Sequence, residues 1–209
     1  MLVNIISIIL STLLSGLSIF VAVRAYKQGT KQIEISNKQS LFKERTNAYI
    51  QLNNLFYLYE NNKFFLNKSE DMPELSLSLL TSNKMLERIV RTDYNPIENE
   101  EDNKFPIKME ELRAFSLQIA LLWEGAESTI ASCFILEYIQ VLCSLHSRLV
   151  YLSAEKKYKQ KELTESKQKF LEAFKQSSLK KDIAELNRLY FEMKEKKVLE
   201  VLKEQIRLK

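Results

Sequence analysis

The sequence predicts an all-α protein: a single N-terminal transmembrane helix, then a cytoplasmic helical bundle that ends in a long charged, partly coiled-coil helical hairpin. Two observations lead to this prediction. The chain has only three glycines and three prolines in 209 residues, too few for the many turns that a β-sheet protein needs. Residues 2–23 carry no charge, although 28% of the whole chain is charged. An apolar helix therefore precedes a polar helical body.

The uncharged stretch is long enough to serve as a membrane anchor, residues 1–24. At helical rise its 22 residues extend about 33 Å, which exceeds the roughly 30 Å of a bilayer's hydrocarbon core. A secretory signal would begin with basic residues and end in a small-residue cleavage site. Here no basic side chain precedes the apolar run, which leads directly into Arg24. We expect a retained anchor in the cell membrane.

The residues that follow the anchor indicate its orientation. Basic residues that flank a membrane helix stay on the cytoplasmic side, so we expect the N-terminus outside and the body in the cytoplasm. Two cysteines, Cys133 and Cys143, lie ten residues apart on one predicted helix, where they cannot bridge each other. Unpaired thiols are typical of a reducing compartment. The juxtamembrane basic residues are Arg24, Lys27, Lys31 and Lys38.

Polar residues inside the anchor share one helical stripe, because they follow each other at intervals of 3, 4, 4 and 3 residues. Small residues let membrane helices approach closely, and serine can hydrogen-bond across such a contact. The stripe predicts a homo-oligomer; a narrow polar pathway that perturbs the membrane, or serines without a role, are the alternatives. The association stripe is Asn4, Ser7, Ser11, Ser15 and Ser18.

Breaks in the helical pattern divide the body into segments. Residues 25–67 form a juxtamembrane segment and a first cytoplasmic helix, with Gly29 and Thr30 as a possible weak point. Residues 68–153 form the bundle core. They comprise a helix from Leu75 to Thr92, a loop from Asp93 to Pro106, and an apolar central stretch from Ile107 to Leu152. In this stretch Gly125 could mark a kink or a close contact between helices. An aromatic stripe indicates the core face of the first helix: Phe42, Tyr49, Leu52, Phe56 and Tyr59.

Residues 154–209 form the charged C-terminal helices. Ser178 suits the N-cap of a final helix, whose apolar residues first follow coiled-coil spacing and then slip onto a shifted stripe at Val198, Leu202 and Ile206. This helix either packs onto the bundle or pairs with a second copy. Its packing stripe is Leu179, Ile183, Leu186, Tyr190 and Met193.

Charge is distributed unevenly along the chain. Residues 24–45 hold six basic and two acidic side chains, residues 46–153 hold nine and fifteen, and residues 154–209 hold sixteen and ten. Basic segments beside the anchor can attract anionic lipid. We do not expect nucleic acid to be a partner, because the C-terminal lysines alternate with glutamates and do not form a separate basic face.

No catalytic or metal-binding motif stands out in the sequence. His146 is the single histidine, and the three glycines are too far apart to form a phosphate-binding loop. Cys143 and His146 lie three residues apart, but ligands from one straight helix cannot complete a zinc tetrahedron. We therefore predict a buried structural histidine, no cofactor, no metal and no catalytic residues.

The run from Leu41 to Tyr49, LFKERTNAY, soon after a single span, resembles that of small bacterial single-pass membrane proteins of the phage abortive-infection and superinfection-exclusion kind. The resemblance covers about the first 60 residues and implies an antiviral role without catalytic residues. Together with the stripe it favours a membrane-anchored, non-enzymatic interaction protein that binds or senses a cytoplasmic partner at the inner membrane face. The alternative is a scaffold or accessory subunit of a larger membrane complex, with a membrane protein as its partner.

Overall fold

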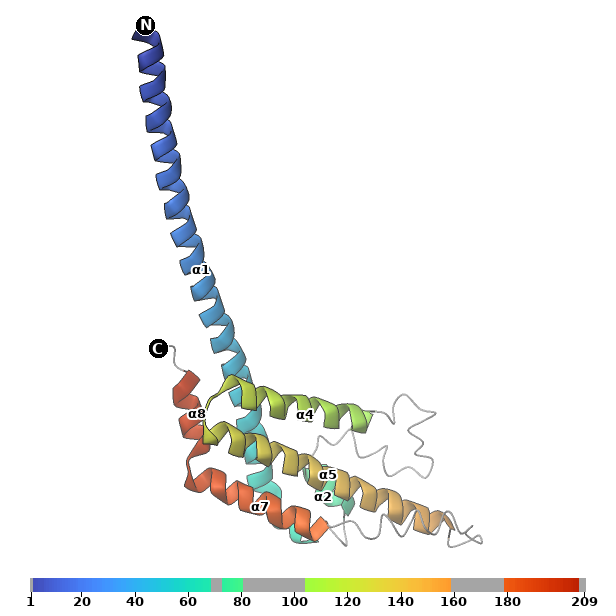
Figure 1. Ribbon diagram of the computed structural model, residues 1–209. Helices are drawn as coiled ribbons and strands as arrows, with labels where there is room; N and C mark the ends of the chain where they lie inside the picture. Colours follow the sequence, from blue (N-terminus) through green and yellow to red (C-terminus); the bar gives the residue numbers. More distant parts are fainter. Residues whose placement is uncertain (1, 69–72, 81–103, 159–178, 207–209) are drawn as a thin grey trace. The chain divides into compact units, whose positions relative to one another are not determined.

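The structure, a computed structural model, describes residues 2–68, 73–80, 104–158 and 179–206 (Figure 1). Every regular element in these ranges is a helix, which confirms the all-α prediction. The α-helices are α1 (Leu2–Asn62), α2 (Pro73–Leu80), α4 (Lys104–Leu122), α5 (Ala126–Tyr158), α7 (Leu179–Glu195) and α8 (Val198–Ile206), with a 3₁₀ helix η1 (Lys63–Lys68) after α1.

Contacts divide the chain into two compact units, with the boundary between Glu44 and Arg45. The boundary falls inside α1 and within the segment 25–67 that the sequence groups as one. The first unit consists of α1 up to Glu44. In it α1 runs through Gly29 and Thr30 without a break, and the Thr30 hydroxyl donates to the carbonyl oxygen of Tyr26 at 3.0 Å. The candidate weak point is therefore ordinary helix.

The second unit is built around α5, which packs against α4, α7, α2 and α8. In Figure 1, α5 lies between α4 and α7. Among the described residues, Ala126–Leu152 is long and apolar enough to cross a membrane by length and composition. Most of this stretch is buried inside the unit, and a central core helix that is covered on several sides needs such a composition. Phe134, Ile135 and Val141 are completely buried.

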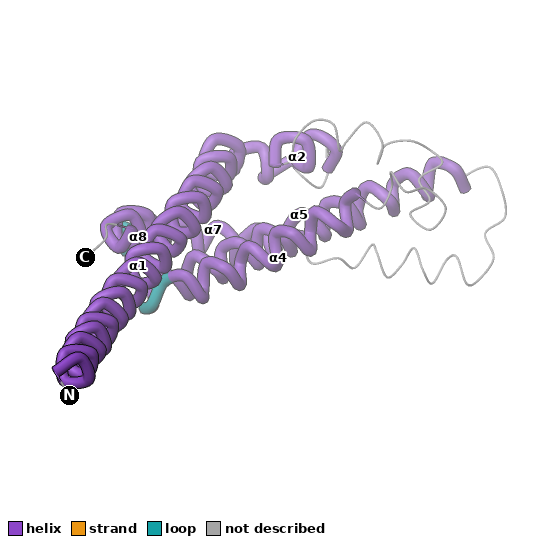
Figure 2. The backbone as a smooth tube through the Cα atoms, turned by 90° about the horizontal axis from the view of Figure 1, so that it is seen from above, coloured by secondary structure: helices purple, strands orange, loops and turns teal. Residues whose placement is uncertain are grey.

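The apolar central stretch from Ile107 to Leu152 consists of two helices, α4 and α5, which are separated at Gly125. The chain leaves the helix at Trp123 and re-enters it at Ala126, through the short loop between α4 and α5 in Figure 2. Gly125 has a φ of 116° there, which is accessible to glycine at little cost. The Ser128 hydroxyl donates to the Gly125 carbonyl oxygen at 2.9 Å, which fixes the start of α5.

The C-terminal part of α1, from Arg45 to Asn62, contributes an aromatic group to the core. Phe56 stacks on Tyr190 with ring centroids 5.1 Å apart, and Tyr59 meets Phe134 edge-on at 5.8 Å. The Tyr59 hydroxyl donates to Asn187 Oδ1 at 2.8 Å. Leu52, Phe56 and Tyr59 of the predicted aromatic stripe are buried, Tyr49 is half-buried, and Phe42, in the first unit, is exposed.

Four further predictions of helix or loop ends differ from the structure or lie outside the described residues. The final helix is broken, because α7 ends at Glu195 and α8 begins at Val198; the slip in apolar spacing marks this break. The loop predicted to end at Pro106 overlaps α4, whose first turn tolerates a proline. The predicted helix Leu75–Thr92 is seen as α2 up to Leu80, and its remainder and the Ser178 N-cap lie outside the described residues.

Candidate functional site

Ser11, Ser15 and Ser18 of the predicted association stripe are exposed on α1. The Ser15 hydroxyl donates to the Ser11 carbonyl oxygen at 2.8 Å, and the Ser18 hydroxyl donates to that of Leu14 at 2.9 Å. These hydroxyl hydrogens are therefore satisfied inside their own helix. Ser15 and Ser18 therefore offer small size for close packing more than they offer free donors. Asn4 and Ser7 are on the same helix, but their side chains lie outside the description.

The juxtamembrane basic residues Arg24, Lys27, Lys31 and Lys38 are all exposed on α1. Lys38 pairs with Glu34 one turn earlier at 3.0 Å, and this contact and the lysine's charge lower the pKa of Glu34. Arg24 lies 5.9 Å from the centre of the Phe20 ring. The cationic surface directly after the apolar stretch is therefore made by Arg24, Lys27 and Lys31.

The five residues of the C-terminal packing stripe are buried, and α7 packs against α5 of the same chain. Tyr190 also donates to Glu60 Oε1 at 2.6 Å, and Lys194 reaches the same oxygen at 2.8 Å. Both hydrogen bonds lower the pKa of Glu60. In this structure the stripe is used to close the body, and its residues are not available as a free surface.

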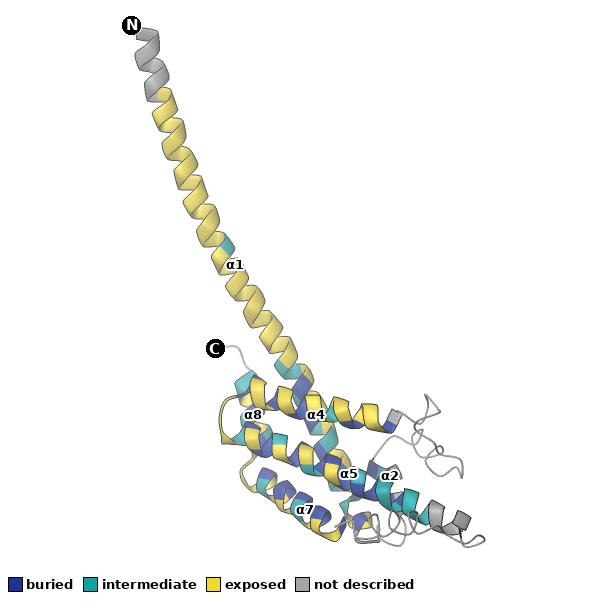
Figure 3. Ribbon diagram, turned by 45° about the vertical axis from the view of Figure 1, so that its right-hand side comes forward, coloured by how far each residue is buried: buried dark blue, intermediate teal, exposed yellow. Residues whose placement is uncertain are grey.

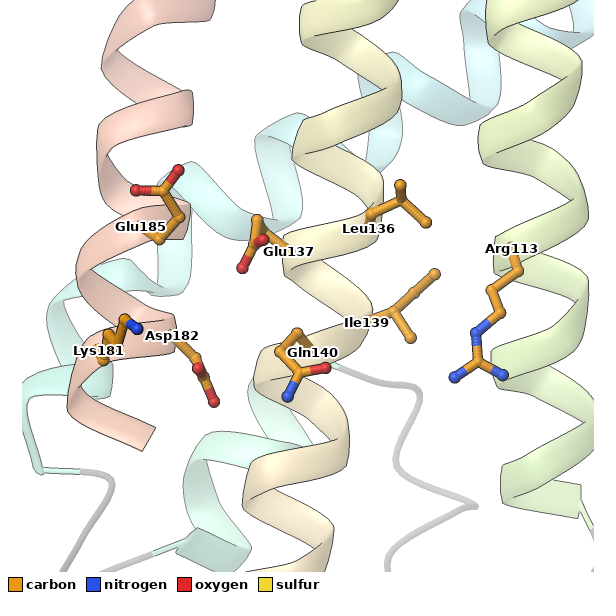
Figure 4. A pocket seen from close by; sticks show the side chains of 8 residues that line it. All are labelled: Arg113, Leu136, Glu137, Ile139, Gln140, Lys181, Asp182 and Glu185. Carbon is orange, nitrogen blue, oxygen red and sulfur yellow. The ribbon is translucent and has the colours of Figure 1, made fainter. Parts of the chain in front are cut away.

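A polar groove of about 430 Å³ runs along the face formed by α4, α5 and α7. Figure 4 shows Arg113 of α4 on one side, the acidic residues of α5 and α7 on the other, and Leu136 and Ile139 between them. The groove is lined by Arg113, Leu136, Glu137, Ile139, Gln140, Lys181, Asp182 and Glu185.

The carboxylates in this groove differ in their burial, hydrogen bonds and pKa shifts. Asp182 is buried and accepts a hydrogen bond from the Ser144 hydroxyl at 2.5 Å. Arg188 donates to Glu185 at 2.7 Å, which lowers the pKa of Glu185. Burial, followed by the charges of Glu185 and Asp182, raises the pKa of Glu137. The groove therefore suits a hydrogen-bond donor or cation near Glu137, and its residues supply no nucleophile–base pair.

Arg45 joins three helices at one end of the second unit. From α1 its Nε donates to the carbonyl oxygen of Leu122, and its Nη1 donates to that of Gln205 at 3.1 Å. Trp123 Nε1 donates to the carbonyl oxygen of Leu202 at 3.2 Å. The carbonyl oxygens of Leu122 and Gln205, at the C-terminal ends of α4 and α8, have no partner within their helices and are satisfied by Arg45. Sequence reasoning missed this junction, because nothing local connects residues 45, 122 and 205.

His146 and Cys143 do not form a pair of reacting groups. The imidazole stacks on Phe105 with centroids 4.2 Å apart, and burial lowers its pKa to about 4. Burial raises the pKa of the half-buried Cys143 thiol, which disfavours the thiolate. Within the described ranges no group of three His, Cys, Asp or Glu side chains is placed to hold a metal ion.

Comparison with protein-family models, curated proteins and solved structures finds no match to the chain.

Proposed function

We propose that the chain is a membrane-anchored, non-enzymatic interaction protein that self-associates and binds a cytoplasmic partner at the inner membrane face in bacterial defence against phage. The observation that carries this proposal is a row of exposed apolar side chains on α1. Eight large apolar residues between positions 10 and 23 are 50–67% exposed. Their burial in hydrocarbon stabilises the chain by an order of 1 kcal/mol or more each. These residues are Leu10, Leu13, Leu14, Leu17, Ile19, Phe20, Val21 and Val23.

The backbone of this segment also suits a bilayer. A spanning segment must satisfy its backbone polar groups internally, and α1 is continuous helix from Leu2 to Asn62. The serine hydroxyls at positions 15 and 18 are bonded to carbonyl oxygens of the same helix. Polar side chains that are satisfied in this way add little to the cost of insertion.

Charge next to the apolar row supports an orientation with the body inside. Arg24, Lys27 and Lys31 follow the row directly and are exposed, and such residues stay cytoplasmic. They also suit the anionic lipid of the inner leaflet. Self-association rests on the stripe of small residues, which lets two copies of α1 approach closely.

The role of the second unit follows from its chemistry. The groove between α4, α5 and α7 holds carboxylates, two basic side chains, an amide and two aliphatic side chains, which suits a binding surface for a protein partner better than a reaction centre. The assignment to phage defence rests on the resemblance of residues 41–49 and the span before them. A scaffold within a larger membrane complex would use the same surfaces with a different membrane protein.

The test compares two triple variants of the full chain, expressed in bacteria. Replacing Ser7, Ser11 and Ser15 with leucine should reduce the oligomer in detergent to smaller species, because bulky side chains keep the helices apart. A matched control replaces Ile5, Ile8 and Ile9 with leucine and should keep the oligomer. An unchanged oligomer in the serine variant contradicts self-association through the anchor.

The same strains test anchoring and defence. The wild-type chain should remain in the membrane fraction after a high-salt wash, and external protease should leave the body intact until the membrane is opened. Cells that express it should lower the plating efficiency of at least one phage, and the serine variant should restore plating. A body cleaved from outside contradicts the orientation. A stoichiometric membrane-protein partner without protection from phage favours the scaffold.

A further inference from the structure

Glu137 is a carboxylate of the groove that no other described residue neutralises. It is half-buried on α5, and it forms no hydrogen bond or ion pair with the described part of the chain. Burial, with the charges of Glu185 and Asp182, raises its pKa, and Arg188, whose charge opposes this shift, is already bonded to Glu185 and Glu192. A half-buried carboxylate without a partner destabilises the fold. A positive group that enters the groove would therefore gain an ion pair there.

The lining of the groove favours an organic cation over a metal ion. Within the described residues, no three carboxylate, thiol or imidazole groups are placed to hold a metal. Leu136 is 46% exposed and Ile139 is buried, and both lie between Arg113 and the acidic residues in Figure 4. Figure 3 shows exposed and buried residues alternating along α5, which leaves one side of this helix open to solvent. Lysine and arginine lay their aliphatic stems on apolar surface of this kind.

Basic residues at the borders of the groove limit the charge of its ligand. Arg113 and Lys181 line it together with the carboxylates. One nitrogen of Arg113 is bonded to Glu110, but its charge remains beside the groove. Two positive groups at the borders repel a second cation on the same ligand. The groove therefore suits a single basic side chain better than a polyamine or a polybasic segment.

We propose that the groove binds one basic side chain, an arginine or a lysine, of the cytoplasmic partner protein. The charged end of this side chain pairs with Glu137, and its stem lies on Leu136. Gln140, exposed on the same helix, supplies an amide oxygen that can accept a further N–H group. Sites for free small molecules are mostly apolar, whereas six of the eight lining residues here are polar or charged. This inference rests on the proposed function, which supplies the partner, and it names the chemistry that holds that partner.

Methyl NMR of the full chain in detergent tests the groove directly. With isotope-labelled leucine and isoleucine methyl groups, the signals of Leu136 and Ile139 report on the groove that they line. The probe is Nα-acetyl-L-argininamide, which carries a guanidinium as its only charge. At millimolar concentration it should shift both signals saturably and leave that of Leu202, buried on α8, in place. Absence of a shift at Leu136 and Ile139 overturns the proposal.

Two comparisons identify the charges that are recognised. Nα-Acetyl-L-citrullinamide, which has the shape of the arginine probe without its charge, should cause no saturable shift. Glu137→Gln should weaken the binding of the arginine probe about fivefold, the loss expected for one partly exposed ion pair. The matched control Glu195→Gln, exposed on α7 outside the groove, should bind as the wild type does. Equal affinity of Glu137→Gln and the wild type overturns the pairing with Glu137.

Competing ligands test the choice of a single side chain from a protein. Spermidine and free L-arginine should bind more weakly than the capped probe, because each carries a further ammonium group. Arg113→Gln should reduce this preference, since it removes a repulsive charge from the border of the groove. Tighter binding of either competitor than of the capped probe overturns a protein side chain as the occupant, in favour of a small metabolite.

Phage plating separates this inference from the proposed function. Cells with Glu137→Gln should lose protection, cells with Glu195→Gln should keep it, and both chains should remain in the membrane fraction. Full protection by Glu137→Gln overturns the groove as the site of the partner and leaves the proposed function standing. If the wild-type chain gives no protection, the defence role and its partner fail, and binding of the arginine probe still decides whether the groove recognises a basic side chain.

Discussion

The Nε of Arg45 on α1 donates a hydrogen bond of 2.8 Å to the carbonyl oxygen of Leu122, the last residue of α4. The same guanidinium reaches the Gln205 carbonyl oxygen near the end of α8. The C-terminus of a helix carries a partial negative charge, so one cation stabilises two helix ends at once. The planar fork of arginine is needed, because its donors must point in two directions.

We expect Arg45→Lys to lower the free energy of unfolding by about 1.5–3 kcal/mol, the range for a lost hydrogen bond to a charged group. Lysine keeps the charge but cannot reach both carbonyl oxygens in one geometry. Thermal or urea unfolding of the detergent-solubilised protein measures the effect. The control Arg113→Lys, on an exposed pair with Glu110, should change the stability by less than about 1 kcal/mol. Equal effects would contradict the role of the junction.

Lys197→Gly should stabilise the body by about 1 kcal/mol. Lys197 has a φ of 48° between α7 and α8, a left-handed conformation that costs a residue with a side chain roughly 1–2 kcal/mol. Its amide donates to the Lys194 carbonyl oxygen at 3.2 Å, which glycine would keep. The control Lys196→Gly should destabilise slightly, because it removes a contact with Glu192. A lower melting temperature for Lys197→Gly would contradict this account.

His146 should make the body less stable as the solution becomes acidic. Burial lowers its pKa from 6.5 to about 4, so the unfolded chain binds a proton first, and stability falls as the pH falls from about 6.5 toward 4. The linked loss is at most about 3 kcal/mol. His146→Phe, which keeps a ring stacked on Phe105, should remove this part of the pH dependence in urea titrations. A slope identical to that of the wild type would show that another group titrates.

Glu137→Gln should stabilise the body at neutral pH by about 0.5 kcal/mol. Burial and the charges of Glu185 and Asp182 raise the pKa of Glu137, so its ionised form is disfavoured in the folded state. A carboxyl group whose pKa is raised in the folded state adds to the free energy of unfolding at low pH, and this contribution is lost as the pH rises through the folded pKa. The stabilisation by Glu137→Gln should therefore disappear in acid. The matched control is Glu195→Gln, an exposed glutamate outside the groove.

The helices themselves were predictable from periodicity, and their ends were less so. Leu52, Phe56 and Tyr59 recur at helical spacing, and all three are buried. The break at residues 123–125 was signalled only by Gly125, because glycine within a helix is compatible with either a kink or an end. The break at Lys197 has no glycine to signal it. There the burial of Val198 and Leu202 outweighs the preference of Lys197 for a right-handed backbone conformation.

The candidate sites also differ in how far the sequence predicts them. Stripes along one helix, such as Ser11, Ser15 and Ser18, can be found from spacing alone. The groove and the junction bring together residues from helices that are far apart in sequence, such as Ser144 with Asp182. No periodicity connects such pairs, since the contacts depend on how the helices pack. Ile107, Leu117 and Leu121 of α4 are exposed, although the apolar composition of the stretch from Ile107 to Leu152 suggested core positions.

The bond between Arg45 and Gln205 joins residues 160 positions apart, which imposes an order on the biosynthesis of this chain. The ribosome must translate almost all of residues 45–206 before the junction can close. Until then α5 lacks the cover of α7 and α8, and its apolar surface is open to chaperones and to neighbouring nascent chains. The apolar N-terminal segment of α1 leaves the ribosome long before that, while the body is still unfolded.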